Sequence, residues 1–414
     1  MNYRKRSRAW AFIFSIAAAI LVLLTWGNYQ YVRQNPGGND FLVHWVGTRS
    51  LVFQGLSPYS DETALEIQEI AYGRPAKAGE HELRVAYPLY SIVLFLPYAL
   101  IGDFLLARAL WMTTLEVTII LLSLVSIRLT TWRPGLLLLT SFFIFSLFWY
   151  HGLRPLINGN AVILVALCVV GAFWAIREGA DELAGVLLAF STIKPQITLL
   201  PIVFVSLYAL WQRRWRLVFW LIGTIILLSL GAALLLPDWI LQNLREVLRY
   251  PSYNPPGTLQ AALRIWFPVF GHRLGWAITI ILALMLLIEW RLAFFAEFRH
   301  FLWTACLTLT ASQWVGIQTD PGNFIVLVPA LVLVFAVWEE RWRDAGRILS
   351  IIIMLLIFSG VWALFLATVE YGYQPQQSPV MFLPLPGFLL VALYWVRWWA
   401  IRAPQVWFDL LTEA

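Results

Sequence analysis

The stretch AWAFIFSIAAAILVLLTWGNYQY, residues 9–31, is apolar over a length that can cross a lipid bilayer. It follows the basic segment MNYRKRSR at 1–8, which resembles the start of a secretory signal peptide. A signal peptide has a shorter apolar stretch and a small-residue cleavage site, and this sequence has neither. The stretch therefore predicts a retained first membrane helix whose N-terminus lies in the cytoplasm.

The composition of the whole chain indicates a membrane protein. Of 414 residues, 60% are hydrophobic and 13% are charged, and a water-soluble domain cannot bury that much apolar surface. The net charge of +6 comes from Arg and Lys at expected helix ends, and no basic stretch suits nucleic acid. Cys168 and Cys306 lie inside apolar runs, so the expected loops carry no disulfide framework. These features fit a bacterial plasma membrane.

Clusters of basic residues predict the cytoplasmic turns. They are Arg128 with Arg133, Arg177, RRWR at 213–216, Arg291 with Arg299, and EERWRDAGR at 339–347. The apolar segments between them lie near 103–127, 134–150, 159–176, 183–193, 196–211, 216–236, 272–289, 300–316, 321–338, 347–367 and 381–400. With the first helix they predict an all-α, multi-pass bundle of about 12 transmembrane helices, with both termini in the cytoplasm.

One apolar segment, YPLYSIVLFLPYALIG at 87–102, is not counted as a crossing. Counting it would move the basic turn at 128–133 outside, so the segment is predicted to lie in the membrane interface or to be re-entrant. Residues 33–102 then form a first outer loop in which 41–54 is a second interfacial helix, with His44 on its polar side. The prediction is a single membrane domain, 1–414, made of modules 1–220 and 221–414, the latter with an outer loop at 237–271.

Residues 183–211 lie between two cytoplasmic basic clusters and must therefore form a hairpin. Its first arm, LAGVLLAFSTI at 183–193, is too short to cross, so the tip at Lys194-Pro195-Gln196 is predicted to lie below the outer surface. A lysine inside the membrane costs roughly 2.5–3.5 kcal/mol on insertion scales unless a partner or water compensates it. We therefore expect an anionic group to meet Lys194.

This topology gathers unusual polar side chains on the outer face. They are Asp40, His44, His151, Arg154, Asn158, Asn160, Lys194, Gln196, Gln318, Asp320 and Asn323. A carboxylate, cations and amides facing one cavity suit transfer chemistry on a charged, hydroxylated lipid. The carboxylate would take a proton from an attacking hydroxyl, and the cations would hold a phosphate leaving group.

Each of these residues also has a purely structural interpretation. Asp40 could cap a helix that begins at Phe41. The others could be turn formers or headgroup anchors: Asn158 and Asn160 beside Gly159, Asp320 before Pro321, and His44, His151 and Arg154. The five His and two Cys show no metal-ligand spacing, and no nucleotide-phosphate loop is present.

The order of several motifs resembles that of family-87 glycosyltransferases, integral-membrane enzymes of the GT-C superfamily. Asp40 followed by Gly-Leu-Ser-Pro-Tyr at 55–59 is similar to the family's Asp and Gly-x-x-Pro-Tyr. Ala-Tyr-Pro-Leu at 86–89 resembles an aromatic-Pro-Pro element, with Leu89 in place of the second Pro. Asn-Gly-Asn at 158–160 falls where the family has Gly-Gln-x-Asn, and Ala184 through Lys194-Pro195 with Arg213-Arg214-Trp215 matches a further block. The resemblance spans roughly residues 1–220 by this motif order; the second half matches in hydropathy alone.

The resemblance implies an activity and roles for residues. Family members take a sugar, often mannose, from a polyprenyl phosphate, place it on a glycolipid or glycan outside the cytoplasm, invert the anomeric centre, and generally use no metal or cofactor. Carried over by position, Asp40 is the general base, and Lys194 with Arg154 would hold the phosphate. The further candidates for substrate contact are His44, Tyr87, His151, Asn158, Asn160, Gln196, Tyr253, Gln318 and Asp320.

Two alternatives stay open. A lipid-linked-sugar flippase or transporter could use the same cations, although the sequence shows no internal repeat of the kind common in transporters. Another sugar, such as arabinofuranose, could replace mannose.

The second outer loop contains DWILQNLREVLRYPSYNPPGTLQ at 238–260. Its first part is amphipathic, which predicts a helix on the membrane surface. Its tail is rich in Tyr, Pro and Asn, a composition suited to contact with sugars, because rings can cover C–H groups and amides can bind hydroxyls. We expect this loop, with Tyr250 and Tyr253, to border the site and to shape acceptor access.

Overall fold

The structure is a computed structural model that describes residues 3–254, 257–315, 317, 320–371 and 375–402. Nearly all of the regular structure is helical, as predicted; the described strands are β1 (Glu370–Tyr371) and β2 (Pro375–Gln376), which pair antiparallel. The chain divides into two compact units. Unit 1 comprises residues 1–118, 155–161 and 232–253, and unit 2 comprises residues 119–154, 162–231 and 254–414. The predicted division into modules 1–220 and 221–414 stays a prediction.

The helices of unit 1 come from three separate parts of the sequence. They are α1 (Tyr3–Gln34), α2 (Asn39–Arg49), α3 (Asp61–Tyr72), α4 (Ile92–Ala99), the first part of α5 (Phe104–Leu129), the end of α7 (Tyr150–Asn158), the last residues of α11 (Trp215–Leu235) and α12 (Trp239–Arg249). Short helical turns lie at Ser50–Gln54, Leu89–Ser91 and Tyr250–Ser252.

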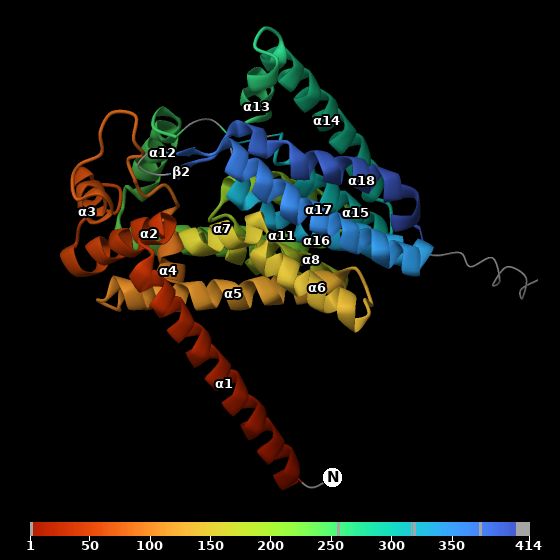
Figure 1. Cartoon of the computed structure of the whole chain (residues 1–414), viewed down its shortest axis with the longest axis horizontal. Coiled ribbons are helices and arrows are strands. Elements are labelled where there is room, and N and C mark those ends of the chain that lie inside the picture. Colours follow the sequence, from red (N-terminus) through yellow and green to blue (C-terminus); the bar gives the residue numbers. More distant parts are fainter. Residues whose placement is uncertain (1–2, 255–256, 316, 318–319, 372–374, 403–414) are drawn as a thin grey trace, which may run out of the picture. The chain divides into compact units, whose positions relative to one another are not determined.

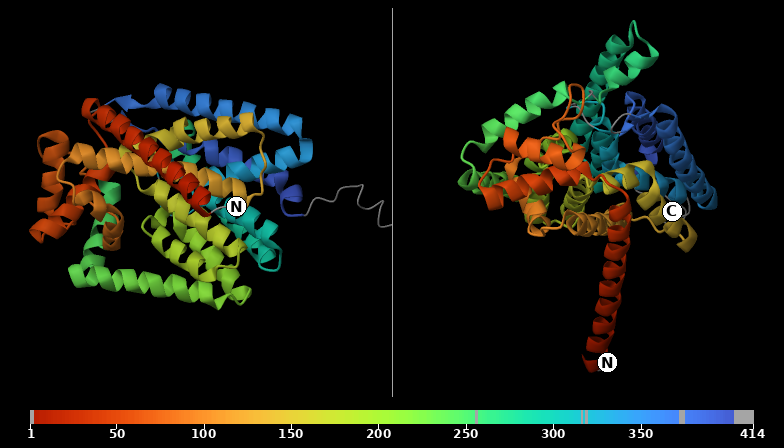
Figure 2. Two further views of the ribbon diagram at one scale, coloured as in Figure 1. Left: turned by 90° about the horizontal axis from the view of Figure 1, so that it is seen from below. Right: turned by 60° about the vertical axis from the view of Figure 1, so that its left-hand side comes forward.

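The helix α1 is one continuous helix, drawn in red in both views of Figure 2, and its apolar span is almost wholly exposed. Hydrogen bonds link it to α5: the Asn28 amide donates to the Thr113 hydroxyl and to the Glu116 carboxylate, each at 3.0 Å. Hydrogen bonds between helices are one of the forces that hold neighbouring helices together where lipid removes the hydrophobic effect. The exposed apolar surface of α1 is that expected of a membrane helix.

The helices of unit 2 follow one another through most of the remaining sequence. They are α6 (Leu136–Phe148), α8 (Val162–Arg177), α9 (Asp181–Ser191), α10 (Pro195–Trp211), α11 (Trp215–Leu235), α13 (Leu259–Trp266), α14 (Gly271–Ala293), α15 (Phe298–Ala311), α16 (Val328–Trp342), α17 (Asp344–Thr368) and α18 (Pro384–Ala400). Two 3-10 helices, η4 (Pro321–Leu327) and η5 (Pro379–Phe382), precede α16 and α18.

The core of unit 2 is built around α16. The window of η4 and α16 from Pro321 to Trp342 is entirely buried, and α15, α17 and α18 pack against α16 (Figure 1). Beside them, α8 and α9 form a closely packed pair. A side chain at Gly185 of α9 would lie 2.5 Å from the Leu217 carbonyl oxygen, so glycine lets α9 and α11 approach closely.

Seven helices of the described chain are long and apolar enough to cross a membrane. An eighth is possible if the bent pair α6 and α7, which meet at 44°, forms one span. The predicted number of about 12 crossings is not confirmed. Several predicted segments correspond to short helices: α8, α9, α10 and α15 have 16, 11, 17 and 14 residues. The predicted interfacial segments 41–54 and 87–102 contain the short helices α2 and α4, and their depth in a membrane stays a prediction.

Candidate active site

The carboxylate of Asp40 lies in the first turn of α2. The helix begins at Asn39 after Gly38, whose left-handed backbone (φ 78°) turns the chain into the helix, so Asp40 is not the cap that its sequence position also allowed. Its Oδ2 atom instead accepts hydrogen bonds from the side-chain amides of Asn158 and Asn160, each at 2.7 Å. Three predicted site residues, from two segments about 118 residues apart in the sequence, therefore meet.

These two amides lie in the turn at the end of α7. Asn158 ends the helix, Gly159 follows with φ 75°, and the backbone N–H of Asn160 donates back to the Pro155 carbonyl. A β-carbon at Gly159 would lie 2.5 Å from that of Phe41. Glycine is thus needed here both for its backbone conformation and for its small size.

His44 and Tyr87 also lie together in unit 1. Their ring centroids are 4.0 Å apart, and His44 also stacks on Phe95 at 4.5 Å. His44 is buried, as are its neighbours on all sides of α2, so the expected polar face of this helix is not found. A small cavity of about 10 Å³, enough for one water molecule, is lined by residues that include His44, Thr48, Tyr59 and Tyr87.

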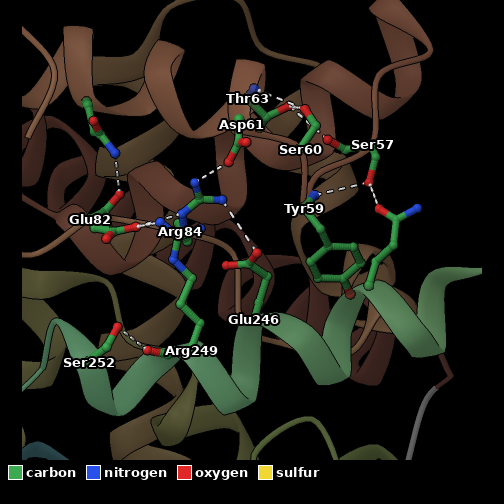
Figure 3. Close-up of polar contacts among 12 residues, drawn as sticks. Ser57, Tyr59, Ser60, Asp61, Thr63, Glu82, Arg84, Glu246, Arg249 and Ser252 are labelled. Carbon is green, nitrogen blue, oxygen red and sulfur yellow. Dashed lines mark hydrogen bonds and ion pairs between the residues drawn. The ribbon is translucent and has the colours of Figure 1, made fainter.

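The helix α12, in the predicted second outer loop, packs beside Tyr87 on residues of the predicted first outer loop (33–102). The side-chain amide of Asn243 donates to the carbonyl oxygens of Ala86 and Tyr87, each at 3.0 Å. Ser57 donates to Gln242 at 2.6 Å (Figure 3). The backbone of Tyr87 is therefore held by a helix more than 150 residues away along the chain.

An ion-pair network continues this interface (Figure 3). Arg84 pairs with Asp61 and Glu82 of the first loop and with Glu246 of α12 at 3.4 Å, while Arg249 pairs with Glu82 at 2.8 Å. The hydrogen bond and charge of Arg84 lower the pKa of Asp61. Burial raises the pKa of Glu246, against the attraction of Arg84 and Arg249.

The amphipathic pattern of α12 was predicted, but not which face would pack against protein. The polar face, with Gln242, Asn243 and Glu246, meets the first loop. The apolar face is exposed, with Leu241 at 69% and Leu248 at 73% of their surface. This is the arrangement expected of a helix whose apolar side meets lipid.

The tail after α12 turns its rings toward the first loop. Tyr250 and Tyr253 lie 5.9 and 5.1 Å from the ring of His81. The Tyr253 hydroxyl is buried and has no hydrogen-bond partner within the described ranges. Burial raises the pKa of Tyr253.

A second polar cluster lies in unit 2, around the start of η4. Lys194 follows α9 and precedes α10, at the tip of the predicted hairpin, and it is buried. Its ammonium group donates to the side-chain oxygen of Asn323 in η4 at 2.8 Å. The sequence predicted the burial of this lysine but could not predict that the amide of Asn323 would meet it.

Other predicted residues gather at the same segment. The ring nitrogen Nδ1 of His151, which is buried, lies 2.7 Å from the Pro321 carbonyl oxygen. Asp320 accepts from the backbone N–H of Gly322 at 2.6 Å, as its turn interpretation predicts. Arg154 lies beside the amide of Gln377, whose oxygen can accept from its Nε at 2.7 Å. Gln196 is half-buried in the first turn of α10, and Gln318 lies outside the described residues.

The sequence of the chain was compared with known protein families. Residues 86–252 match glycosyltransferase family 87. This match supports membership of the chain in the family. The family-87 match covers Tyr87, the Asn158–Asn160 turn, the Lys194 hairpin and α12, and so includes elements of both units. It begins after Asp40, and it extends past residue 220, where the motif-based resemblance ended. No curated protein and no solved structure gives a significant match.

The match to family 87 indicates a glycosyltransferase, and the apolar helices of the chain indicate a membrane protein. The predicted resemblance to family 87 is thereby confirmed. The roles of the individual site residues stay predictions.

Proposed function

We propose that this family-87 chain transfers a sugar from a polyprenyl-phosphate donor to a glycolipid or glycan, with mannose as the first candidate sugar. The observation that carries the proposal is the Asp40 carboxylate bound by two asparagine amides. In the proposed reaction Asp40 removes the proton of an acceptor hydroxyl, whose oxygen attacks the anomeric carbon. The bond from that carbon to the phosphate oxygen breaks, the anomeric centre inverts, and polyprenyl phosphate leaves with the bonding electrons.

The two amides support this role for Asp40. Hydrogen bonds from Asn158 and Asn160 to one carboxylate oxygen fix the orientation of the group. A general base must be held within hydrogen-bond reach of the proton that it removes, and preorganisation of this kind serves that need.

Lys194 and Arg154 are proposed to hold the donor phosphate. A cation that interacts with the leaving phosphate stabilises the charge that grows as the sugar departs. In unit 2 both side chains lie next to amides, Asn323 and Gln377, and these amides are candidates for hydrogen bonds to the donor. We propose that transfer takes place on the outer face of a bacterial plasma membrane, with both termini in the cytoplasm.

Reconstitution of the full chain into vesicles tests the reaction. The vesicles would contain polyprenyl-phosphate mannose with a radiolabelled sugar, and a bacterial lipid extract would serve as acceptor. The proposal predicts labelled product together with released polyprenyl phosphate. Donor that crosses the bilayer unchanged, with no product, would contradict the proposal and support a flippase. Product from polyprenyl-phosphate arabinofuranose, but not from the mannose donor, would overturn the choice of mannose.

A further inference from the structure

Two buried side chains of α5 hold the backbone around the Asp40 site. The guanidinium group of Arg108 donates from Nη1 to the Asn35 carbonyl at 2.9 Å and from Nη2 to the Ile157 carbonyl at 3.2 Å. One turn further along, the ring N–H of Trp111 donates to the Gly159 carbonyl at 2.8 Å. Both side chains are 1% exposed and lie on one face of the helix.

The three carbonyl groups flank the residues of the proposed site. Asn35 lies just before the Gly37–Gly38 turn that leads into α2 and Asp40. The carbonyls of Ile157 and Gly159 stand on either side of Asn158, so α5 holds the peptide units adjoining the amide that binds Asp40. Arg108 therefore ties the segment that carries the carboxylate to the turn that carries its hydrogen-bond donors.

The local sequence allows this close approach. A β-carbon at Gly38 would collide with the Arg108 side chain, and one at Gly159 would lie 3.3 Å from the Trp111 ring. Both glycines have positive φ angles, 78° and 75°. Glycine in these two places lets Arg108 and Trp111 reach the backbone that a larger residue would shield.

Burial of the charged Arg108 side chain costs free energy, so space filling alone does not explain this residue. Its charge loses hydration on burial. Its described hydrogen-bond partners are neutral carbonyls, and its Nε atom has no hydrogen-bond partner among the described residues. An apolar side chain of similar size would pack the same volume without this cost. A role in fixing the geometry of the site explains why a guanidinium stands here, because its several N–H donors reach two separate carbonyls.

We propose that Arg108 is a positioning residue that acts through Asp40, assisted by Trp111. It holds the Asn158–Asn160 turn against the start of α2, so that both amides meet the same carboxylate oxygen. This inference rests on the proposed function, in which Asp40 is the general base.

The variant Arg108→Met tests the proposal in the reconstituted full chain with polyprenyl-phosphate mannose. A shift of about 1 Å in a catalytic group can cost about 10² in rate, so kcat should fall by roughly that factor. The KM for the donor should stay within about twofold, because no contact with the donor is removed. Arg108→Lys should recover part of the rate, and Trp111→Phe, which loses one N–H and keeps most of the ring, should lose less than Arg108→Met.

Arg49→Met is the matched control. Arg49 also belongs to unit 1 and donates to a backbone carbonyl, that of Ala99 at 2.7 Å, but it does not touch the turn. This variant should keep the wild-type kcat. Size-exclusion profiles and thermal unfolding would identify any variant that does not fold. If Arg108→Met fails to fold, the rates of Arg108→Lys and Trp111→Phe test the proposal instead.

A double-mutant cycle separates this inference from the proposed function. If Arg108 acts through Asp40, Asp40→Asn with Arg108→Met should lose no more activity than Asp40→Asn alone. Losses that multiply, or a folded Arg108→Met enzyme as active as Arg49→Met, would overturn the positioning role. Full activity of Asp40→Asn would instead overturn the base assignment itself.

Discussion

Glu246 of α12 pairs with Arg84 of the segment 33–102 at 3.4 Å, and the two residues are 162 positions apart in the sequence. Their side chains are 4% and 8% exposed, so the pair is well shielded from water. Arg84 also binds Asp61 and Glu82, so it joins three carboxylates at the interface between α12 and the segment 33–102.

Removal of Arg84 should destabilise the protein more than removal of Glu246. Arg84→Met leaves Glu246 buried without its partner, a change that typically costs about 3–5 kcal/mol. Glu246→Gln leaves Arg84 with two carboxylates and should cost less. Thermal unfolding in detergent would show which of the two variants is destabilised more. Arg216→Met is the control, because its pair with Glu182 is 79% and 44% exposed and should contribute about 0–1 kcal/mol. Equal effects of Arg84→Met and Arg216→Met would show that the network contributes little.

The two tyrosines after α12 are predicted to serve the acceptor. Their rings pack beside His81, and together they offer apolar faces suited to sugar C–H groups. Tyr250→Ala with Tyr253→Ala should raise the KM for the acceptor more than that for the donor. Ser252→Ala, an exposed change between them, is the control. Unchanged donor hydrolysis and unchanged transfer in the double variant would show that this segment has no part in acceptor binding.

Gly159→Ala should disrupt the turn that carries the two amides. The new methyl group would combine the strain of a positive φ, about 1–2 kcal/mol, with a clash against Phe41 that typically costs about 1–3 kcal/mol. Gly73→Ala is a matched control, because its φ is 66° and its surroundings are open, so it bears the strain alone. Thermal unfolding and transfer activity should both fall further in Gly159→Ala. Similar losses in the two variants would argue against close packing at the turn.

The pair Arg74–Glu80 gives the first outer loop a dependence on pH. Hydrogen bonds from Arg74 and from the Lys77 backbone lower the pKa of Glu80 from 4.5 to about 2. A carboxyl whose pKa is lowered on folding adds stability above its unfolded pKa, and this is lost as the pH falls toward the folded value. The difference in unfolding midpoint between wild type and Glu80→Gln should therefore be constant above about pH 4.5 and shrink below it. A difference that is the same at pH 3 and pH 7 would contradict this.

Local patterns in the sequence predicted the helices well. The first helix, the short arm before Lys194 and the helices near 272–289 and 347–367 all lie where the apolar runs are. The count of about 12 crossings is not confirmed, because helices such as α8 and α10 are apolar but short. The family was predicted from motif order, which depends on sequence alone.

The partners of the site residues could not be predicted in the same way. Burial of Lys194 followed from its place between two apolar arms, but its contact with Asn323 joins segments 129 residues apart. The polar side of α12 was visible in its periodicity, and its attachment through Asn243 was not. Arg108 gave no signal at all, because an arginine near a helix start is common in membrane proteins. Such contacts depend on the folded arrangement of distant segments.

The rate of Asp40→Asn in the reconstituted chain tests the central claim most directly. The asparagine side chain keeps the size of Asp40 and an oxygen that can accept from Asn158 and Asn160, but it cannot take a proton at neutral pH. With polyprenyl-phosphate mannose, transfer should fall by roughly 10²–10⁴ while donor binding and folding persist. Asp103→Asn, at an exposed carboxylate that caps the start of α5, should leave the rate unchanged. Transfer by Asp40→Asn at the wild-type rate would contradict the assignment of Asp40 as the general base.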